Sequence, residues 1–298
     1  MFRLAQLSDP HLGPLPPVSF AELASKRVLG YLNWHLHRSK TLMQGSSVET
    51  VLADIKRAAP DHIAVTGDLI NIGLEPEIVN ARRWLDQIGH PQDVSVVPGN
   101  HDAYVPGSVD RAIAAWAPFA TGDATAGPAF PYLRRRGDVA IIGVSSAIAT
   151  GPFMATGLVD ADQGKRLANL LRETGDAGLC RVVLMHHLPV DGATKWKSRL
   201  LKADQFRAII AEAGAELILH GHTHRASTNW ISGKTRPVPV VGVQAASLQP
   251  SAQKRGAGWN MFEIERNNRS WRITHVDHCV AAGGTQLEEL SRSILTPP

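Results

Sequence analysis

The sequence predicts a layered α/β protein, and two observations carry that prediction. Short apolar runs rich in Val, Ile and Leu alternate with amphipathic stretches through most of the chain, as in strands packed against helices. After residue 237 the pattern changes to closely spaced strands with no long helix between them. Such a run favours antiparallel pairs at the far side of the core.

Each predicted element is short and ends at polar residues or glycine. The expected strands are 3–7, 62–66, 94–97, 139–144, 181–185 and 216–219. The expected helices are one that opens with the capping box Ser46-Ser47-Val48-Glu49, then 75–88, 108–116, 160–172 and 203–213. The late strands are PVPVVGV, WNMFEIE and WRITHVD. Because no repeat or low-complexity linker marks a boundary, we expect one domain over residues 1–298.

Composition limits the class of protein. With 298 residues, 44% of them hydrophobic, the chain can bury a large core. No apolar run approaches the roughly 20 residues that span a bilayer, and Asp9 precedes any signal-like apolar segment, so we expect the mature chain to begin at Met1. Cys180 and Cys279 lie far apart without metal-ligand spacing, which favours a cytoplasmic protein. The net charge of +4 suits a small anionic substrate, and no stable nucleic-acid complex is expected.

Five predicted strand ends carry Asp, Asn or His. The segments are SDPHL, TGDLIN, PGNHDAY, MHHLP and HGHTHR. In open α/β sheets, ligands gather at the carboxyl ends of the strands, so these loops should converge on one site. Mixed oxygen and imidazole donors suit Mn, Fe or Zn. Seven such donors are too many for one ion, whereas two divalent ions about 3.5–4 Å apart, sharing a carboxylate, would use them all.

The motifs in this order resemble the signature of the calcineurin-like metallophosphoesterase superfamily. They are Asp9-x-His11, Gly67-Asp68, Gly99-Asn100-His101-Asp102, His186 and Gly221-His222-x-His224. The resemblance covers roughly the first 230 residues. It implies a four-layer αββα sandwich of the α/β (α+β) class, in which helices flank two mixed β-sheets and a dinuclear metal site lies at the C-terminal ends of the strands.

The resemblance also assigns residues. It implies that Asp68 bridges the two metals, the first held by Asp9, His11, Asp68 and His224, and the second by Asp68, Asn100, His186 and His222. His187 is then expected behind the ligands or against the substrate. His101 should face the phosphate and stabilise its charge or protonate the leaving oxygen, with Asp102 holding the imidazole in orientation.

The implied reaction is hydrolysis of a phosphate ester by in-line attack of a metal-bridging hydroxide. Within the superfamily, the motifs and the chain length most resemble the bacterial branch that acts on cyclic nucleotides and glycerophosphodiesters, so we expect a small phosphodiester. Three alternatives stay open: a hydrolase of a nucleotide-lipid pyrophosphate, a phosphomonoesterase, and a catalytically inactive scaffold of the same fold.

Two segments are candidates for substrate recognition. In KWKSRLLKADQFR, Lys195 and Arg199 either reach an anionic substrate or form a solvated face. In residues 19–44, Val28, Leu29, Leu32 and Leu36 form an apolar stripe at helical spacing. This stretch is expected to cap the site as a helical insertion, to form an interface in a homo-oligomer, or to lie on a membrane surface, with peripheral membrane contact the less favoured.

Overall fold

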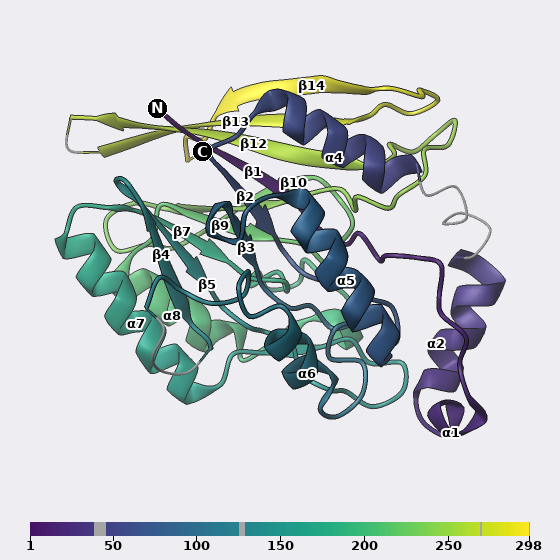
Figure 1. The fold of residues 1–298 in the computed structure, drawn as a ribbon. Helices are drawn as coiled ribbons and strands as arrows, with labels where there is room; N and C mark the ends of the chain where they lie inside the picture. Colours follow the sequence, from purple (N-terminus) through teal and green to yellow (C-terminus); the bar gives the residue numbers. More distant parts are fainter. Residues whose placement is uncertain (39–45, 125–128, 269, 298) are drawn as a thin grey trace.

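A computed structural model describes residues 1–38, 46–124, 129–268 and 270–297. Two six-stranded mixed sheets face each other, and helices cover their outer faces (Figure 1). The predicted four-layer αββα sandwich is therefore confirmed. Within the described residues, no helix has the length and apolar character needed to cross a membrane.

The first sheet combines a parallel half with an antiparallel half. Its order is β14-β13-β12-β1-β2-β3. The strands are β1 (Phe2–Leu7), β2 (His62–Val65), β3 (Val94–Val96), β12 (Gly258–Asn267), β13 (Ser270–Val280) and β14 (Leu287–Ile294). Strands β1, β2 and β3 run parallel, whereas β12 is antiparallel to β1 and continues into the antiparallel β13 and β14.

The second sheet has a parallel centre and antiparallel edges. Its order is β10-β11-β9-β7-β5-β4. The strands are β4 (Tyr132–Arg136), β5 (Val139–Gly143), β7 (Cys180–Leu184), β9 (Leu217–His220), β10 (Ser227–Ile231) and β11 (Val238–Gly242). A further parallel pair joins β6 (Gly157–Leu158) to β8 (Leu200–Leu201).

One expectation for the late strands is only partly met. The segment PVPVVGV forms β11, which does not pair with the other two late strands. It pairs antiparallel with β10 and lies parallel to β9, with Val240 opposite Ile218. Its valines are buried on both faces, since Val241 packs between the sheets and Val240 packs against helices. Burial on both sides suits the interior of a parallel sheet. WNMFEIE and WRITHVD do pair with each other, as β12 and β13.

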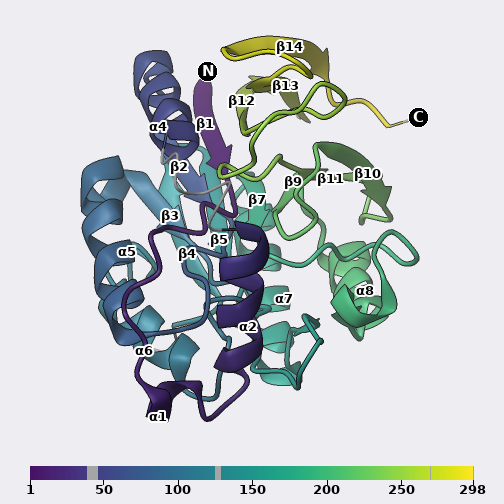
Figure 2. The ribbon, with the colours of Figure 1, turned by 90° about the vertical axis from the view of Figure 1, so that its right-hand side faces the viewer.

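The helices form the outer layers. On the first sheet lie α4 (Ser46–Ala58), α5 (Glu75–Ile88) and α6 (Ser108–Ala115), and on the second α7 (Ala161–Asp176) and α8 (Ala203–Ala213) (Figures 1 and 2). Single 3-10 turns are η2 (Pro91–Asp93) and η3 (Trp196–Ser198). Asp160 caps α7 by accepting hydrogen bonds from the amides of Asp162 and Gln163. The side chain of Ser46, on which the predicted capping box depends, lies outside the described residues.

Alternation along the strands divides the core. In β7, Val182 and Leu184 pack between the two sheets, whereas Val183 packs under the helices together with Phe206 of α8. Successive strand residues point to opposite faces, so a strand covered on both sides must be apolar throughout. Because both faces of such a strand are buried, its position in the sheet is fixed. The position of its C-terminal residue at the edge of the sheet is therefore fixed as well.

The N-terminal segment 19–38 stands clear of the sheets. It comprises α1 (Phe20–Leu23), α2 (Arg27–Asn33) and a π-helical turn, η1 (Trp34–Arg38), and we call it the cap segment (Figures 1 and 2). Ser19 opens α1 with a capping box to Glu22. Residues 39–44 of the predicted insertion lie outside the described residues.

Candidate metal centre

The ends of five strands bring polar side chains from both sheets together. Asp9, Asp68 and Asn100 follow the neighbouring strands β1, β2 and β3 of the first sheet. His186 and His222 follow β7 and β9, which are neighbours in the second. The Gln6 side-chain amide donates a hydrogen bond to the His220 carbonyl at 3.0 Å and ties the two sheets at this end. The predicted convergence is thus a consequence of the topology.

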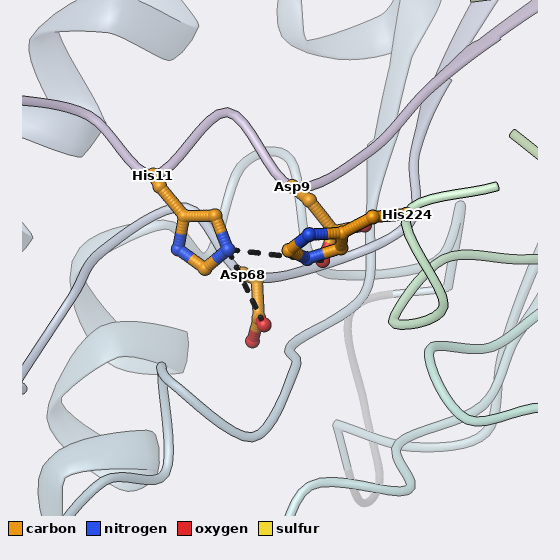
Figure 3. Close-up of side chains that lie close together, drawn as sticks. All are labelled: Asp9, His11, Asp68 and His224. Carbon is orange, nitrogen blue, oxygen red and sulfur yellow. Dashed lines mark hydrogen bonds and ion pairs between the residues drawn. The ribbon is translucent and has the colours of Figure 1, made fainter. Parts of the chain in front are cut away.

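One group of candidate ligands consists of Asp9, His11, Asp68 and His224, whose ligand atoms all lie within 4.8 Å of one another (Figure 3). The His224 Nε2 is 3.0 Å from the Asp9 Oδ1. The His11 Nε2 lies 3.8 Å from the Asp68 Oδ2. The two carboxylates are almost fully buried. Buried acids held around imidazoles in this way are arranged to share a cation.

A second group shares Asp68. The ligand atoms of Asp68, His186 and His222 also lie within 4.8 Å of one another. The His186 Nε2 is 3.4 Å from the Asp68 Oδ2 and 3.2 Å from the Asn100 Oδ1, which brings the Asn100 amide to the same place. Two groups with one carboxylate in common form the pattern of a dinuclear divalent metal site.

Backbone carbonyls orient two of the imidazoles. The Thr66 carbonyl lies 2.7 Å from the His186 Nδ1, and the Ser198 carbonyl lies 2.9 Å from the His222 Nε2. A carbonyl only accepts hydrogen bonds, so each of these ring nitrogens carries the proton and the opposite nitrogen is left for a metal. The donor set of carboxylate, amide oxygen and imidazole fits Mn, Fe or Zn.

The electrostatics couple the acids to the imidazoles. Burial raises the pKa of Asp68, but the neighbouring His186, His101 and His11 hold it well below its usual range. Burial lowers the pKa of His186, yet the Asp68 carboxylate raises it to about 9. His222 is dominated by burial, which lowers its pKa to about 4. The site therefore keeps its carboxylates ionised inside a dry environment.

The backbone at the ligands is unusual. Five of the seven predicted ligand residues adopt left-handed conformations, with φ of 54° at Asp9, 42° at His11, 57° at Asp68, 65° at His222 and 55° at His224. Residues other than glycine rarely do so. At Gly99 a Cβ would collide with the Asp68 carboxylate, so only glycine permits this approach. The loops after β1, β2 and β9 thus begin with sharp turns that carry these candidate ligands.

The structure corrects the role expected of Asp102. Its carboxylate accepts hydrogen bonds from the backbone amides of Asp68, Leu69, Ile70 and Gly99 at 2.8–3.1 Å and does not hold the imidazole of His101. The Asn71 carbonyl does so instead, 2.6 Å from the His101 Nδ1. Asp102 is buried and immobilises the loop that carries Asp68. Burial and the charge of Asp68 raise the pKa of Asp102 to about 7.

A pocket of about 320 Å³ opens beside the second group. Asn100 and His101 are among the residues that line it. The cap segment supplies one wall, and the loops around residues 153–155 and 197–198 supply the other. Apolar and aromatic side chains dominate this lining, notably Leu29, Trp34, Ile72, Tyr104, Phe153 and Met154.

Two cap residues hold this wall in place, and sequence reasoning missed their role. The Arg27 guanidinium donates to the carbonyls of Ile72 and Gly73 at 3.1 and 2.7 Å. The Lys26 ammonium donates to the Thr150 hydroxyl at 3.1 Å and lies 4.6 Å from the centre of the Tyr104 ring. Their positions at one end of an apolar helical stripe were visible in the sequence, but their partners were not.

Tyr104 connects this wall to His101. The two rings are stacked with centroids 5.7 Å apart and an interplanar angle of 23°. At Gly30, a Cβ would lie 2.5 Å from the Tyr104 hydroxyl and the Ile72 side chain, so α2 approaches this closely only with glycine.

The residues predicted to contact substrate fall in different places. Lys195 and Arg199 are not among the described residues that line the pocket, whereas Lys197 is. Arg199 instead donates to the Trp196 carbonyl and stacks on the Trp196 ring. His187 is fully buried, bound to the Ser146 hydroxyl and the Ala155 carbonyl, and its ring lies 4.5 Å from that of His222. It supports the ligands and the pocket wall from behind, and burial holds its pKa well below the usual value.

Comparison with known proteins agrees with this geometry. Residues 2–226 match the calcineurin-like phosphoesterase family, and the chain belongs to that family. A probable cyclic nucleotide phosphodiesterase from Synechococcus sp. is 27% identical over 225 residues, which cover 74% of this chain and 78% of the relative.

Solved structures share the fold. A dimetal phosphatase from Danio rerio superposes with a TM-score of 0.66 at 10% identity, over 99% of this chain and 98% of its own. A purple acid phosphatase from yellow lupin gives a TM-score of 0.54 at 12% identity, over 97% of this chain and 52% of its own. The family establishes a hydrolase that acts on phosphate esters and has a dinuclear divalent metal site.

Proposed function

We propose that this protein hydrolyses a small phosphodiester with two divalent ions held at the strand ends. The observation that carries the proposal is the sharing of Asp68 between two clusters of ligand atoms, beside a pocket that Asn100 and His101 line. Ions bound there would supply positive charge for the phosphoryl oxygens and a nucleophilic water at neutral pH. We infer Mn, Fe or Zn from the mixed donor set.

In this proposal the side chains of the protein position the two ions and protonate the leaving oxygen. In this proposal Asp9, His11 and His224 hold one ion, Asn100, His186 and His222 hold the other, and Asp68 bridges. His101 donates a proton from its Nε2 to the leaving oxygen, because its Nδ1 is engaged by the Asn71 carbonyl. The four backbone amides that donate hydrogen bonds to the Asp102 carboxylate hold the Asp68 and His101 motifs rigidly together.

The choice of a phosphodiester of the cyclic nucleotide or glycerophosphodiester type rests on the likeness to the Synechococcus relative. The pocket supports a substrate with at least one sizeable substituent, since its 320 Å³ lies directly beside His101. We retain the cytoplasm as the proposed location, because both cysteines are buried free thiols.

An assay of the Mn-loaded protein tests the proposal. Bis(p-nitrophenyl) phosphate and 3′,5′-cyclic AMP should be hydrolysed faster than p-nitrophenyl phosphate, and chelation should abolish the activity. A preference for the monoester would make the protein a phosphomonoesterase. Two bound metals with no turnover of any ester would indicate the scaffold alternative.

A further inference from the structure

The segments that form the walls of the pocket carry an unusual share of the exposed apolar surface. Among the described residues, nine large apolar side chains are exposed, and five of them lie on these segments. We call these five the cap rim: Val28, Leu32 and Leu36 on the cap segment, and Phe153 and Trp196 on the facing loops. Phe20, on the adjoining α1, is 94% exposed. A cluster of this kind on a soluble domain marks a surface that meets something apolar.

Two features of the backbone place the side chains of the cap rim at the surface. Val28, Leu32 and Leu36 recur every four residues through α2 and η1, so they share one face of this helical stretch, while Gly30 and Asn33 of α2 line the pocket. Phe153 is 76% exposed although its φ is 62°, a conformation that costs an aromatic residue free energy. The chain therefore holds this ring out at the opening at a cost to its own stability.

Cations accompany the apolar side chains. Lys195 and Lys197 flank Trp196 and are exposed, and Arg199 stacks on the Trp196 ring. Residues 192–202 contain no acidic residue, and neither do residues 150–155. In the cap segment the one acidic residue, Glu22, is bound to Ser19. An aromatic side chain between cations, next to a helix with an apolar face, is the composition of surfaces that lie on anionic membranes.

The position of the pocket favours a membrane over a protein as the partner that binds the cap rim. A protein bound across the cap rim would close the opening through which substrate reaches His101. A bilayer that carries the substrate would deliver it there instead. Leu29, Trp34, Phe153 and Met154 line the same pocket as His101, and this apolar lining would accept a hydrocarbon substituent.

We propose that the cap rim docks on an anionic lipid bilayer and that the pocket takes the apolar arm of a phosphoester carried in that bilayer. This inference rests on the proposed phosphoesterase function. It narrows the substrate class to phosphoesters with a hydrocarbon or other apolar substituent.

Vesicle binding tests the docking surface. The wild-type protein should co-sediment with vesicles of phosphatidylcholine and phosphatidylglycerol in equal parts, more than with phosphatidylcholine alone, and high salt should weaken the binding. Leu32→Ser with Leu36→Ser should weaken it by ~10-fold or more, and Lys195→Glu by roughly fivefold or more. The matched control, Val79→Ser with Ile294→Ser, removes two other exposed apolar side chains and should leave binding unchanged. Equal loss in the control, or no binding by the wild type, would overturn the docking surface.

Inhibition by alkyl phosphates tests the pocket without vesicles. Hexyl phosphate should inhibit hydrolysis of bis(p-nitrophenyl) phosphate more strongly than ethyl phosphate, by roughly fourfold for each methylene that enters the pocket. Phe153→Ser should reduce that gain. Equal inhibition by the two compounds would show that the pocket does not bind an apolar arm and would overturn that part of the proposal.

The two levels of inference fail in different ways. If the wild type hydrolyses the aryl diester but neither binds vesicles nor prefers the longer alkyl phosphate, the membrane inference is wrong and the proposed function stands. If it hydrolyses no ester, the proposed function itself fails. Light scattering that shows a dimer dissociated by the Leu32→Ser, Leu36→Ser variant would assign the cap rim to a second copy of the chain and overturn the bilayer as its occupant.

Discussion

The metal centre and the cap segment face each other across one pocket, and they are stabilised differently. At the metal centre, Asp9, Asp68 and His186 are buried, and each contacts a residue that follows a strand of the opposite sheet. On the cap segment, by contrast, α1 and α2 contain no buried residue. The segment is held by the buried Trp34, by Tyr31 packed against a small cluster that includes Ile72 and Tyr104, and by the hydrogen bonds of Lys26 and Arg27. Under the proposed function, residues at the strand ends would carry out the chemistry, and the cap segment, which is less deeply buried, would select the substrate.

The largest effect should come from the shared carboxylate. Asp68→Ala should remove both ions and nearly all hydrolysis, because Asp68 belongs to both ligand groups. Metal analysis of protein expressed with Mn measures this, with exposed Asp176→Ala as the control. If the purified wild type contains one ion or none per chain, the dinuclear interpretation is wrong.

The next largest effect should come from the residue between the two regions. His101→Ala should keep both metals yet lower kcat by about 10² to 10⁴, the range for a positioned acid or charge stabiliser. The loss should shrink with leaving groups that need no proton, measured over a series of aryl diesters. A variant that loses metal would show instead that His101 is a ligand.

A smaller effect should follow from loosening the cap segment. Arg27→Met releases the carbonyls of Ile72 and Gly73, next to the Asn71 carbonyl that orients His101, so kcat should fall roughly tenfold with both metals kept. In a His101→Ala background the same change should have little further effect, since its route through His101 is already lost. Arg57→Met, an exposed arginine on α4, is the control. Full additivity would show that Arg27 does not act through His101.

The smallest effect is expected at the basic loop. Lys197→Ala should raise KM for polyanionic substrates a few-fold, with kcat unchanged, because this side chain lines the pocket mouth. Lys195→Ala and Arg199→Ala should change KM less, since neither side chain lines the pocket. Steady-state kinetics on a charged and an uncharged-armed diester would separate the three. Equal changes for all three residues would mean that the loop contributes only its net charge.

The sequence predicted the convergence of the candidate ligands better than it predicted their surroundings, for a physical reason. The apolar runs 63–65 and 182–185 are followed within three residues by Asp or His, so the position of each candidate ligand follows from local pattern and parallel topology. The partner of His101 was missed because Asn71 acts through its backbone carbonyl, which no side-chain pattern reports.

The strands that were not predicted from the sequence, β4, β10 and β14, have a similar explanation. β4 and β10 are edge strands with polar and half-buried residues, and β14 is largely exposed, so none of them shows an uninterrupted apolar run. The misassigned β11 differs in the opposite way. Its Val-rich segment predicted a strand correctly, but only long-range packing against β9 decides which sheet it joins.

The left-handed backbone at Asp9, His11, Asp68, His222 and His224 bears on how the protein could be evolved in the laboratory. Each such residue costs about 1–2 kcal/mol in an L-amino acid chain, within a total stability of about 5–15 kcal/mol for a typical domain. Selection for heat resistance alone would therefore favour glycine or asparagine at these turns. Thermostable descendants obtained without an activity screen should accumulate such changes and lose metal while keeping the sandwich intact.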